Sequence, residues 1–414
     1  MLFTHSHQYK EKAGLLKFSI LFMKDMAPRA SQLAIPLCLS FGIPIALYII
    51  FILLGSVPFF QRHFVYAYRF NTVFWHDLNK PEYWGFARNQ VTPFSLPTID
   101  GEDVYAWHIL PLPTYLKHED NLQAQQSGFS NDVTKTASFR LLKDDPHARL
   151  VIYFHGNAGH VAQGFRPDSY HTLTDTSCYH VLAIDYRGFG KSTGVPSEEG
   201  LVRDGATAVD WAMHVAGIPA DRIVLLGQSL GTAVTSGVAE HYAIQGIEFA
   251  GIILAAGFSS MPALLASYTA GGVIPVLSPI RPIPPLLRFF QSFIVDKWES
   301  ASRLAHVVSL TRTRLRLTLI HAKNDAEIPY HESDVLFNSA ARAVIDEDLD
   351  DAGFSSWKEQ QTVHRDDGTF VAIVSTAPDT IIREEVVPYG GHNDIMMSSA
   401  VSLAVMRSFG LDMN

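Results

Sequence analysis

The stretch from Arg222 to Glu240 contains the pattern that most constrains how this chain can fold. An apolar, β-branched run at 223–226 is typical of a buried strand, and the residues after 231 suit a helix. Between them lies Gly-x-Ser-x-Gly, formed by Gly227, Gln228, Ser229, Leu230 and Gly231. A sharp strand-to-helix turn leaves no room for side chains two residues either side of the serine, so both positions need glycine. The pattern predicts that Ser229 stands on a strained corner beside free N–H groups that favour negative charge.

A second copy of the pattern, at 190–194, contains Ser192. It follows a polar loop and precedes Val-Pro-Ser-Glu at 195–198, so no strand runs into it and no helix begins on it. We therefore expect Ser229 to be the nucleophile and Ser192 to be a loop residue. The Gly-Lys-Ser at this second site does not match a phosphate-binding loop, which requires glycine where Asp185 stands.

Residues 30–61 carry no charged side chain, whereas residues 1–29 contain five basic residues and two acidic ones. About 20 apolar residues suffice to cross the hydrocarbon layer, so we expect a transmembrane anchor at 30–61. The run is too long and begins too late for a cleaved signal peptide, which leaves a buried helix as the alternative. The basic segment at 1–29 favours a cytoplasmic N-terminus, with the rest of the chain on the lumenal side of the endoplasmic reticulum or another endomembrane.

Aromatic residues crowd the stretch 64–86. They suit either an interfacial belt or packing beneath the edge of the following domain. The net charge of −9 argues against nucleic acid as a partner, and the 47% hydrophobic content supports a sizeable core. The two cysteines, Cys38 and Cys178, are not expected to form a structural disulfide.

From residue 150 onward, strand-like apolar runs alternate with helical stretches. The expected strands are 150–154, 180–184, 223–226, 251–255 and 316–320, with helices after 159, at 200–216 and after Ser229, and an edge strand at 103–111. This alternation predicts an α/β fold with a mostly parallel sheet covered by helices on both faces. Ligands of such a sheet bind at the carboxyl ends of its strands.

Three segments depart from this alternation within the predicted catalytic domain, 62–414. The stretch 258–306 is rich in proline and apolar residues and is expected to form a cap over the carboxyl edge of the sheet. The polar stretch 116–147 suits an exposed loop. The insertion 343–384 is acidic at 346–351, and its run at 370–374 suits an added hairpin strand.

A serine hydroxyl becomes a useful nucleophile only when a base removes its proton. His392 is the expected base, because a probable strand ends before it in two glycines that free the loop. The base in turn needs a carboxylate to fix its tautomer. Asp325 follows the strand at 316–320 and lies between Ser229 and His392 in the sequence, with Glu327 and Asp334 as competitors.

An oxyanion hole requires two N–H groups aimed at the same point. Leu230 would supply one as the residue after the nucleophile, and the backbone of Asn157, in the loop after the strand at 150–154, would supply the other. No close pair of histidines with a carboxylate suggests a metal ligand set, and no cofactor is expected.

The motifs His-Gly-Asn-Ala-Gly, Asp-Tyr-Arg-Gly-Phe-Gly-Lys-Ser, Gly-Gln-Ser-Leu-Gly-Thr and His-Ala-Lys-Asn-Asp-x-x-Ile-Pro occur in this order. Over roughly residues 78–410 the chain resembles the α/β-hydrolase superfamily, and within it the membrane-anchored lysophospholipid and monoacylglycerol lipases and their Bem46-like relatives. The resemblance implies an α/β-hydrolase fold and the roles given above to Ser229, Asp325, His392, Asn157 and Leu230. It also implies hydrolysis of lipid acyl esters.

Three functions remain open at this point. The first is a lipid esterase anchored in a membrane. The second is a peptidase or acyltransferase on the same scaffold. The third is a catalytically silent membrane tether, which is disfavoured because every catalytic residue type is present and in order.

Overall fold

The computed structural model describes residues 40, 42–70, 72, 74–270, 272, 274–345 and 349–410. The chain divides into two compact units, Met1–Val57 and Pro58–Asn414. The predicted basic segment, 1–29, and residues 30–39 of the predicted anchor lie outside the described residues.

The described part of the first unit contains helix α2, Ile43–Gly55. Its apolar residues favour a helix, Pro44 stands in the first turn where its missing N–H costs nothing, and Ser56 closes the helix by donating to the Ile52 carbonyl. A helix of 13 residues is about 20 Å long, less than the ~30 Å hydrocarbon core. Among the described helices, none alone is long and apolar enough to span a membrane, but α2 and the following α3, Pro58–Tyr66, meet the criterion when taken together across a short break. The predicted single transmembrane helix is therefore not shown.

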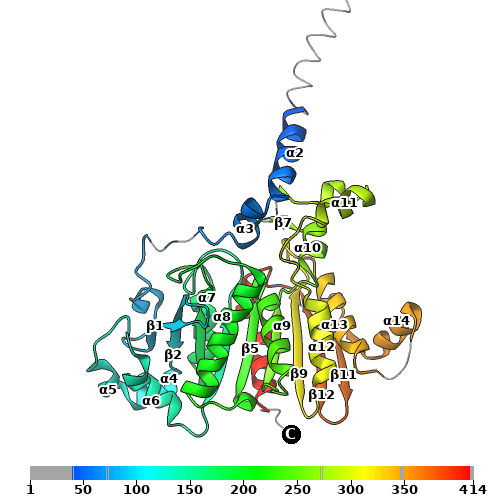
Figure 1. Ribbon diagram of the computed structural model, residues 1–414. Helices are drawn as coiled ribbons and strands as arrows, with labels where there is room; N and C mark the ends of the chain where they lie inside the picture. The colour runs from blue at the N-terminus through cyan, green and yellow to red at the C-terminus, as the bar shows by residue number, and fades with distance from the viewer. Residues whose placement is uncertain are drawn as a thin grey trace, which may run out of the picture. The chain divides into compact units, whose positions relative to one another are not determined.

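A 10-stranded sheet forms the centre of the second unit (Figure 1). Its strand order is β1-β2-β4-β3-β5-β6-β9-β12-β11-β10. The neighbours from β4 to β12 run parallel, and the two pairings at each end of the sheet are antiparallel: β1·β2 and β2·β4 at one end, β12·β11 and β11·β10 at the other. The strands are β1 Val91–Pro97, β2 Asp103–Ile109, β3 Arg149–Phe154, β4 Tyr179–Ile184, β5 Ile223–Gln228, β6 Gly251–Ala255, β9 Leu315–Ala322, β10 Thr362–His364, β11 Phe370–Thr376 and β12 Thr380–Val387. The predicted mostly parallel sheet is thus confirmed.

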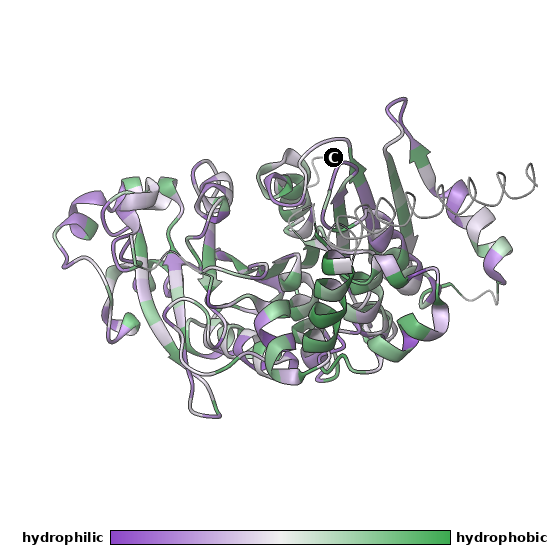
Figure 2. Cartoon of the chain, turned by 90° about the horizontal axis from the view of Figure 1, so that it is seen from above, coloured by the Kyte–Doolittle hydropathy of each residue, from purple (hydrophilic) through white to green (hydrophobic). Residues whose placement is uncertain are grey.

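Helices cover both faces of the sheet, because its central strands are hydrophobic on both sides. In front of the sheet in Figure 1 lie α8 Glu198–Asp210, α9 Leu230–Ala243, α12 Ser300–Leu310 and α13 His331–Arg342. Behind it lie α7 Arg166–Thr174 and α15 Ser399–Ser408. Hydrophobic residues, green in Figure 2, run along the strands and the helices packed on them.

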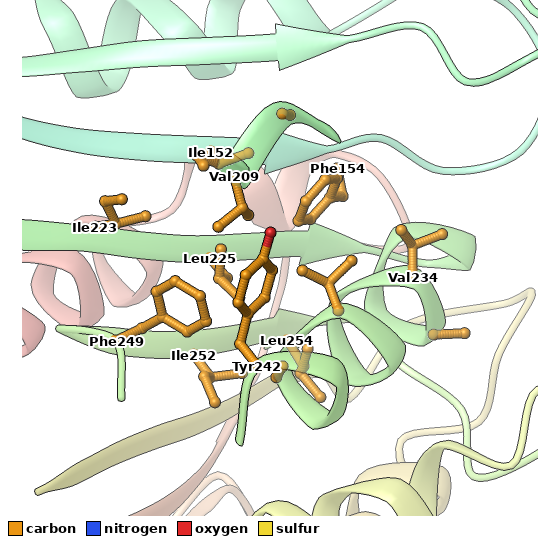
Figure 3. Close-up of a cluster of buried hydrophobic side chains, with 14 of the residues drawn as sticks. Ile152, Phe154, Val209, Ile223, Leu225, Val234, Tyr242, Phe249, Ile252 and Leu254 are labelled. Carbon is orange, nitrogen blue, oxygen red and sulfur yellow. The ribbon is translucent and has the colours of Figure 1, made fainter. Parts of the chain in front are cut away.

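Tyr242 shows how the front layer packs. Its ring lies among Val209, Leu225 and other apolar side chains of the sheet and helices (Figure 3), while its hydroxyl donates to the Asp210 carboxylate at 2.7 Å. Burying an aromatic ring while its hydroxyl keeps a partner avoids the cost of an unsatisfied polar group.

The edge of the sheet nearest the N-terminus differs from the prediction. The strand expected at the edge, β2, lies between β4 and β1, which pairs with it from Val91 to Pro97. The stretch 116–147, predicted as an exposed loop, contains the short helices α5 Glu119–Gln123 and α6 Ala137–Lys143. Leu122, Phe139 and Leu142 are buried beneath them, so this segment covers part of the core instead of lying free in solvent.

The predicted cap, 258–306, follows β6 and contains α10 Met261–Ser267, the short strands β7 Thr269–Ala270 and β8 Ile274–Pro275, and α11 Pro284–Gln291. It ends in the first turns of α12, which packs beside α9 and α13. Gln291 ties α11 to α10 by donating to the Pro262 carbonyl at 2.7 Å.

The insertion 343–384 contains α14 Asp351–Gln360, β10, β11 and the beginning of β12. The predicted hairpin strand at 370–374 is confirmed as β11, which pairs antiparallel with β10 and β12. Of its acidic run, residues 346–348 lie outside the described residues.

Candidate active site

Ser229 lies at the junction of β5 and α9, at the carboxyl edge of the sheet. Its backbone has φ 53° and ψ −121°, a region that L-residues rarely occupy. A Cβ on Gly227 would collide with the Gly231 carbonyl, and a Cβ on Gly231 with the Phe154 carbonyl. The two glycines thus allow the tight strand-to-helix turn that the sequence predicts.

The structure brings three residues that are far apart in sequence into one hydrogen-bonded line. His392 Nε2 lies 2.9 Å from Ser229 Oγ, and His392 Nδ1 lies 2.8 Å from Asp325 Oδ2. Asp325 follows β9 and His392 follows β12, and these strands are parallel neighbours. Their carboxyl ends therefore deliver both side chains to the edge where β5 presents Ser229.

The Asp325 carboxylate is held by hydrogen bonds on both oxygens. Oδ1 accepts from the backbone N–H groups of Glu327 at 2.8 Å and Ile328 at 2.9 Å. Oδ2 faces both His392 and His321 Nε2, the latter at 3.2 Å. Burial raises the pKa of Asp325, but the hydrogen bonds from His321 and His392 outweigh burial and hold it below its ordinary value. The side chain is therefore ionised at neutral pH.

The two competing acids are engaged elsewhere. Glu327 accepts a hydrogen bond from the Tyr268 hydroxyl at 3.2 Å, and Asp334 pairs with Lys358 at 3.1 Å. His392 Nδ1 therefore faces Asp325 and neither of them. Ser192 is also occupied: its hydroxyl donates to the Asp185 carbonyl at 2.6 Å and accepts from the Tyr105 N–H at 2.8 Å.

The loop after β3 contains Asn157, whereas Leu230, the other residue predicted to serve the oxyanion hole, begins α9. In the loop after β3, the N–H groups of Ala158 and Gly159 donate to the carbonyls of Tyr66 and Phe70, at 2.9 and 2.8 Å. Among the described residues, the N–H groups of Asn157 and Leu230 have no intramolecular acceptor. Both residues line the same cavity as Ser229.

Three residues support this site and were not assigned such roles from the sequence. Gln228 Nε2 donates to the His392 carbonyl at 3.0 Å, and Asn324 Oδ1 accepts from the Gly391 N–H at 2.9 Å, so both hold the histidine loop. Arg166 is buried beneath the loop after β3 and donates to the carbonyls of residues 156, 157, 158 and 160. Their partners are remote or belong to the backbone, so no local motif indicates them.

Two cavities meet at Ser229. The first, of about 240 Å³, is lined mainly by apolar side chains of α3 and the cap, including Phe64, Met261, Leu264 and Tyr268. The second, of about 210 Å³, is lined mostly by residues of polar type, among them His392. Ser229 and Asn157 line both. Within the described ranges, no group of three or more His, Cys, Asp or Glu side chains could hold a metal ion.

The comparisons with known proteins agree with this architecture. The family model described as serine aminopeptidase, S33, matches residues 145–316, which include Ser229 and Asn157 but not Asp325 or His392. Human protein ABHD12B is 31% identical over 194 residues, covering 47% of this chain and 50% of that protein. The rat lysophosphatidylserine lipase ABHD12 is 25% identical over 288 residues, covering 69% and 64%. The chain thus spans less than two thirds of the length of these relatives.

Solved structures with a similar trace include an esterase from Pyrococcus furiosus, Pf2001, at 14% identity and a TM-score of 0.44, covering 79% of this chain and 93% of that one. Another is an α/β hydrolase from Vibrio vulnificus at 15% identity and a TM-score of 0.47, covering 73% and 91%. In its sequence the chain is therefore similar to the serine aminopeptidase family over residues 145–316 and to the lysophosphatidylserine lipases over 288 residues.

Proposed function

We propose that this chain is a membrane-associated serine hydrolase that cleaves the acyl ester of single-chain lipids such as monoacylglycerols or lysophospholipids. The observation that carries the proposal is the hydrogen-bonded line from Ser229 through His392 to Asp325, placed beside an apolar cavity. The similarity to lysophosphatidylserine lipases supports the same substrate class.

The geometry supports a two-step acyl transfer. His392 Nε2 takes the proton of Ser229 Oγ as that oxygen attacks the ester carbonyl carbon, and Asp325 stabilises the imidazolium that forms. The carbonyl oxygen becomes negatively charged and is stabilised by the N–H groups of Asn157 and Leu230. The carbon–oxygen bond to the alcohol then breaks, and His392 returns the proton to the departing alcohol. A water molecule, deprotonated by His392, cleaves the acyl-enzyme, and the fatty acid leaves as Ser229 regains its proton.

The two cavities suit different halves of the ester substrate. A general acid must reach the leaving oxygen, so the alcohol half belongs on the side that His392 lines, which is the polar cavity. The acyl chain then occupies the apolar cavity beneath α3 and the cap. Each buried methylene contributes about 0.8 kcal/mol, so this arrangement favours long acyl chains over short ones.

A serine aminopeptidase is the second candidate, because the matching family model carries that description. Such an enzyme holds the free ammonium of its substrate on the acyl side of the scissile bond. Among the described residues that line the apolar cavity, none is acidic. The described lining of this cavity therefore offers no carboxylate to an ammonium, which favours the lipid ester.

Membrane association is supported by α2 and by two helices of the second unit. α3 begins three residues after α2 ends, and α3 and α11 lie above the upper edge of the sheet in Figure 1. Gln61 joins α3 to the end of the cap, because its amide bonds both the Phe293 carbonyl and the Val295 N–H. The two helices and the residues after α11 expose large apolar side chains: Phe59, Phe60, Phe64, Leu286, Phe289 and Phe293. Such a patch suits a lipid surface, and the anchor at 30–61 and the lumenal orientation remain part of this proposal.

A fluorophosphonate probe tests the nucleophile. Ser229→Ala should abolish labelling. Ser192→Ala should still label, and should lose only about 1 kcal/mol of stability because the hydrogen bonds of the Ser192 hydroxyl are removed. Labelling that persists in Ser229→Ala would refute the assignment.

The substrate class is tested by kcat/KM for monoacylglycerols of increasing chain length. We expect a rise from short to long chains that flattens in Leu264→Ser, which lines the apolar cavity, but not in Leu286→Ser, which is exposed on α11. A preference for acetyl or butyryl esters, or faster cleavage of peptides, would overturn the lipid proposal and leave the serine mechanism intact.

A further inference from the structure

The polar cavity beside Ser229 has a definite chemical character. The residues that give it this character are Gln163, Arg166, Gln228, Glu327, His392 and Asn393. Because His392 must protonate the leaving oxygen, the alcohol half of the substrate lies among these side chains. Their charges therefore decide which head groups are accepted, an inference that rests on the proposed esterase function.

Arg166 contributes little to a ligand in this cavity. Its two terminal nitrogens donate to backbone carbonyls between residues 156 and 160, at 2.7 to 3.2 Å. The side chain is 4% exposed, so its charge stabilises the loop after β3 from below. An anionic phosphate in the cavity would have to compete with those carbonyls for the guanidinium.

Glu327 is the acid of this cavity: among the described lining residues, no other side chain is acidic. The Tyr268 hydroxyl donates to Glu327 Oε2, and among the described residues no other side chain donates to this carboxylate. Burial, followed by the negative charge of Glu327, raises the pKa of Tyr268, so the phenol stays protonated and donates to the carboxylate.

Glu327 also stands at the division between the two cavities. Glu327 lines the polar cavity, whereas its neighbour Ile328 and its partner Tyr268 line the apolar one. Glu327 is not the acid of His392, because His392 Nδ1 bonds to Asp325. A half-buried carboxylate with a free lone pair, beside the path of the leaving group, has the chemistry of a cation subsite.

We propose that Glu327 binds a primary ammonium in the alcohol half of the substrate, and that the enzyme therefore prefers lysophospholipids with an amine-bearing head group. A head group of the same size that carries hydroxyls in place of the ammonium loses the charged hydrogen bond. A charged hydrogen bond of this kind discriminates about tenfold. Anionic head groups without an amine are disfavoured because Glu327 repels them.

The test compares two substrates with the same acyl chain and the same phosphodiester, lysophosphatidylethanolamine and lysophosphatidylglycerol. Wild type should show a kcat/KM about tenfold higher for the ethanolamine lipid. Glu327→Gln should reduce this ratio to about one, and Glu327→Lys should invert it. The fraction of each preparation that labels with a fluorophosphonate corrects for misfolded protein.

Two controls separate ammonium binding from other effects of the substitution. Asp394→Asn removes an equal charge from an exposed position near His392 that lines neither cavity, and should keep the ratio. Tyr268→Phe removes the hydrogen bond to Glu327 but leaves the carboxylate in place. It should therefore also keep the ratio of kcat/KM for the two lipids.

Outcomes for this subsite and for the proposed function are distinguishable. Wild type that cleaves both lipids but prefers the glycerol lipid, or a ratio unchanged in Glu327→Gln, would overturn the ammonium subsite alone. If the ratio of kcat/KM for the two lipids fell as much in Asp394→Asn as in Glu327→Gln, the effect would be due to net charge, and the ammonium subsite would be overturned. Wild type that cleaves neither lipid nor monoacylglycerol would overturn the esterase proposal, and the subsite with it.

Discussion

The amide of Gln228 donates to the backbone carbonyl of His392 at 3.0 Å, so the residue before the candidate nucleophile also holds the loop of the candidate base. This hydrogen bond ties the elbow to the histidine loop, although the two residues are 164 positions apart in sequence. Holding a base within hydrogen-bond distance of its nucleophile accounts for much of the advantage of a preorganised site.

Gln228→Leu keeps the size of the side chain and removes this hydrogen bond. We expect kcat to fall about tenfold to a hundredfold with little change in KM, because the base is misplaced while the acyl cavity is untouched. Steady-state kinetics on one monoacylglycerol measures this, with the rate of fluorophosphonate labelling as a second readout. A rise in KM at constant kcat would show instead that Gln228 contacts the substrate.

Asp325→Asn should lower kcat by about 10³ to 10⁴-fold, since the imidazole would lose its orienting carboxylate and favour the wrong tautomer. Asp334→Asn is the matched control, because Asp334 pairs with Lys358 outside the site and should leave labelling intact. A dead Asp334→Asn beside an active Asp325→Asn would mean that another acid serves His392.

Asp185 is buried, and burial raises its pKa from 3.8 to about 6. A raised folded-state pKa means that stability from this group is fully present below pH 4 and is lost as pH rises through 6. A difference of about two pH units corresponds to a cost on the order of 3 kcal/mol at neutral pH. Asp185→Asn should therefore gain stability relative to wild type as pH rises from 4 to 7.

Urea unfolding at several pH values checks this prediction. The nearby His155 does not offset the cost, because burial lowers its pKa and leaves it neutral, although its Nε2 lies 3.5 Å from Asp185 Oδ1. A stability difference that is constant across pH would show that Asp185 keeps its ordinary pKa in the folded chain.

Sequence patterns predicted a residue's role where that role depends on its neighbours in the chain. Gly227 and Gly231 are readable because the turn they permit is formed by their immediate neighbours. Asp325 and His392 follow strands, so an alternating α/β pattern places them at one edge of the sheet. In the structure His392 lies within hydrogen-bond distance of both Ser229 and Asp325, and their catalytic roles stay a prediction.

The features that were missed depend on distant contacts or on misleading composition. β1 contains Pro93 and Pro97, which suppress a strand signal, yet it is an edge strand where missing N–H groups are tolerated. The stretch 116–147 is polar on average, and only the packing of Phe139 and Leu142 shows that it covers the core. No sequence pattern could indicate that the Arg166 guanidinium donates its hydrogen bonds to the backbone of the loop that contains Asn157.

Tyr66, the last residue of α3, and Phe70 contact the loop after β3, which contains the proposed oxyanion donor Asn157. The carbonyls of Tyr66 and Phe70 accept hydrogen bonds from the N–H groups of Ala158 and Gly159, the two residues that follow Asn157. Both residues have positive φ, and the two bonds hold the loop in this conformation, in which we propose that the Asn157 N–H serves the substrate.

A chain lacking residues 1–57 keeps these contacts and should label with a fluorophosphonate like the full chain. A chain lacking residues 1–70 loses them and should label at least about a hundredfold more slowly, since a displaced oxyanion donor costs that much. Tyr66→Phe is the matched control, because it keeps both backbone bonds and removes only the hydrogen bond from the hydroxyl to Asp296. Melting temperatures separate lost catalysis from lost folding. If the 1–70 deletion folds and labels as fast as the 1–57 deletion, the loop after β3 needs no support from this segment, and Asn157 must be positioned by Arg166 alone.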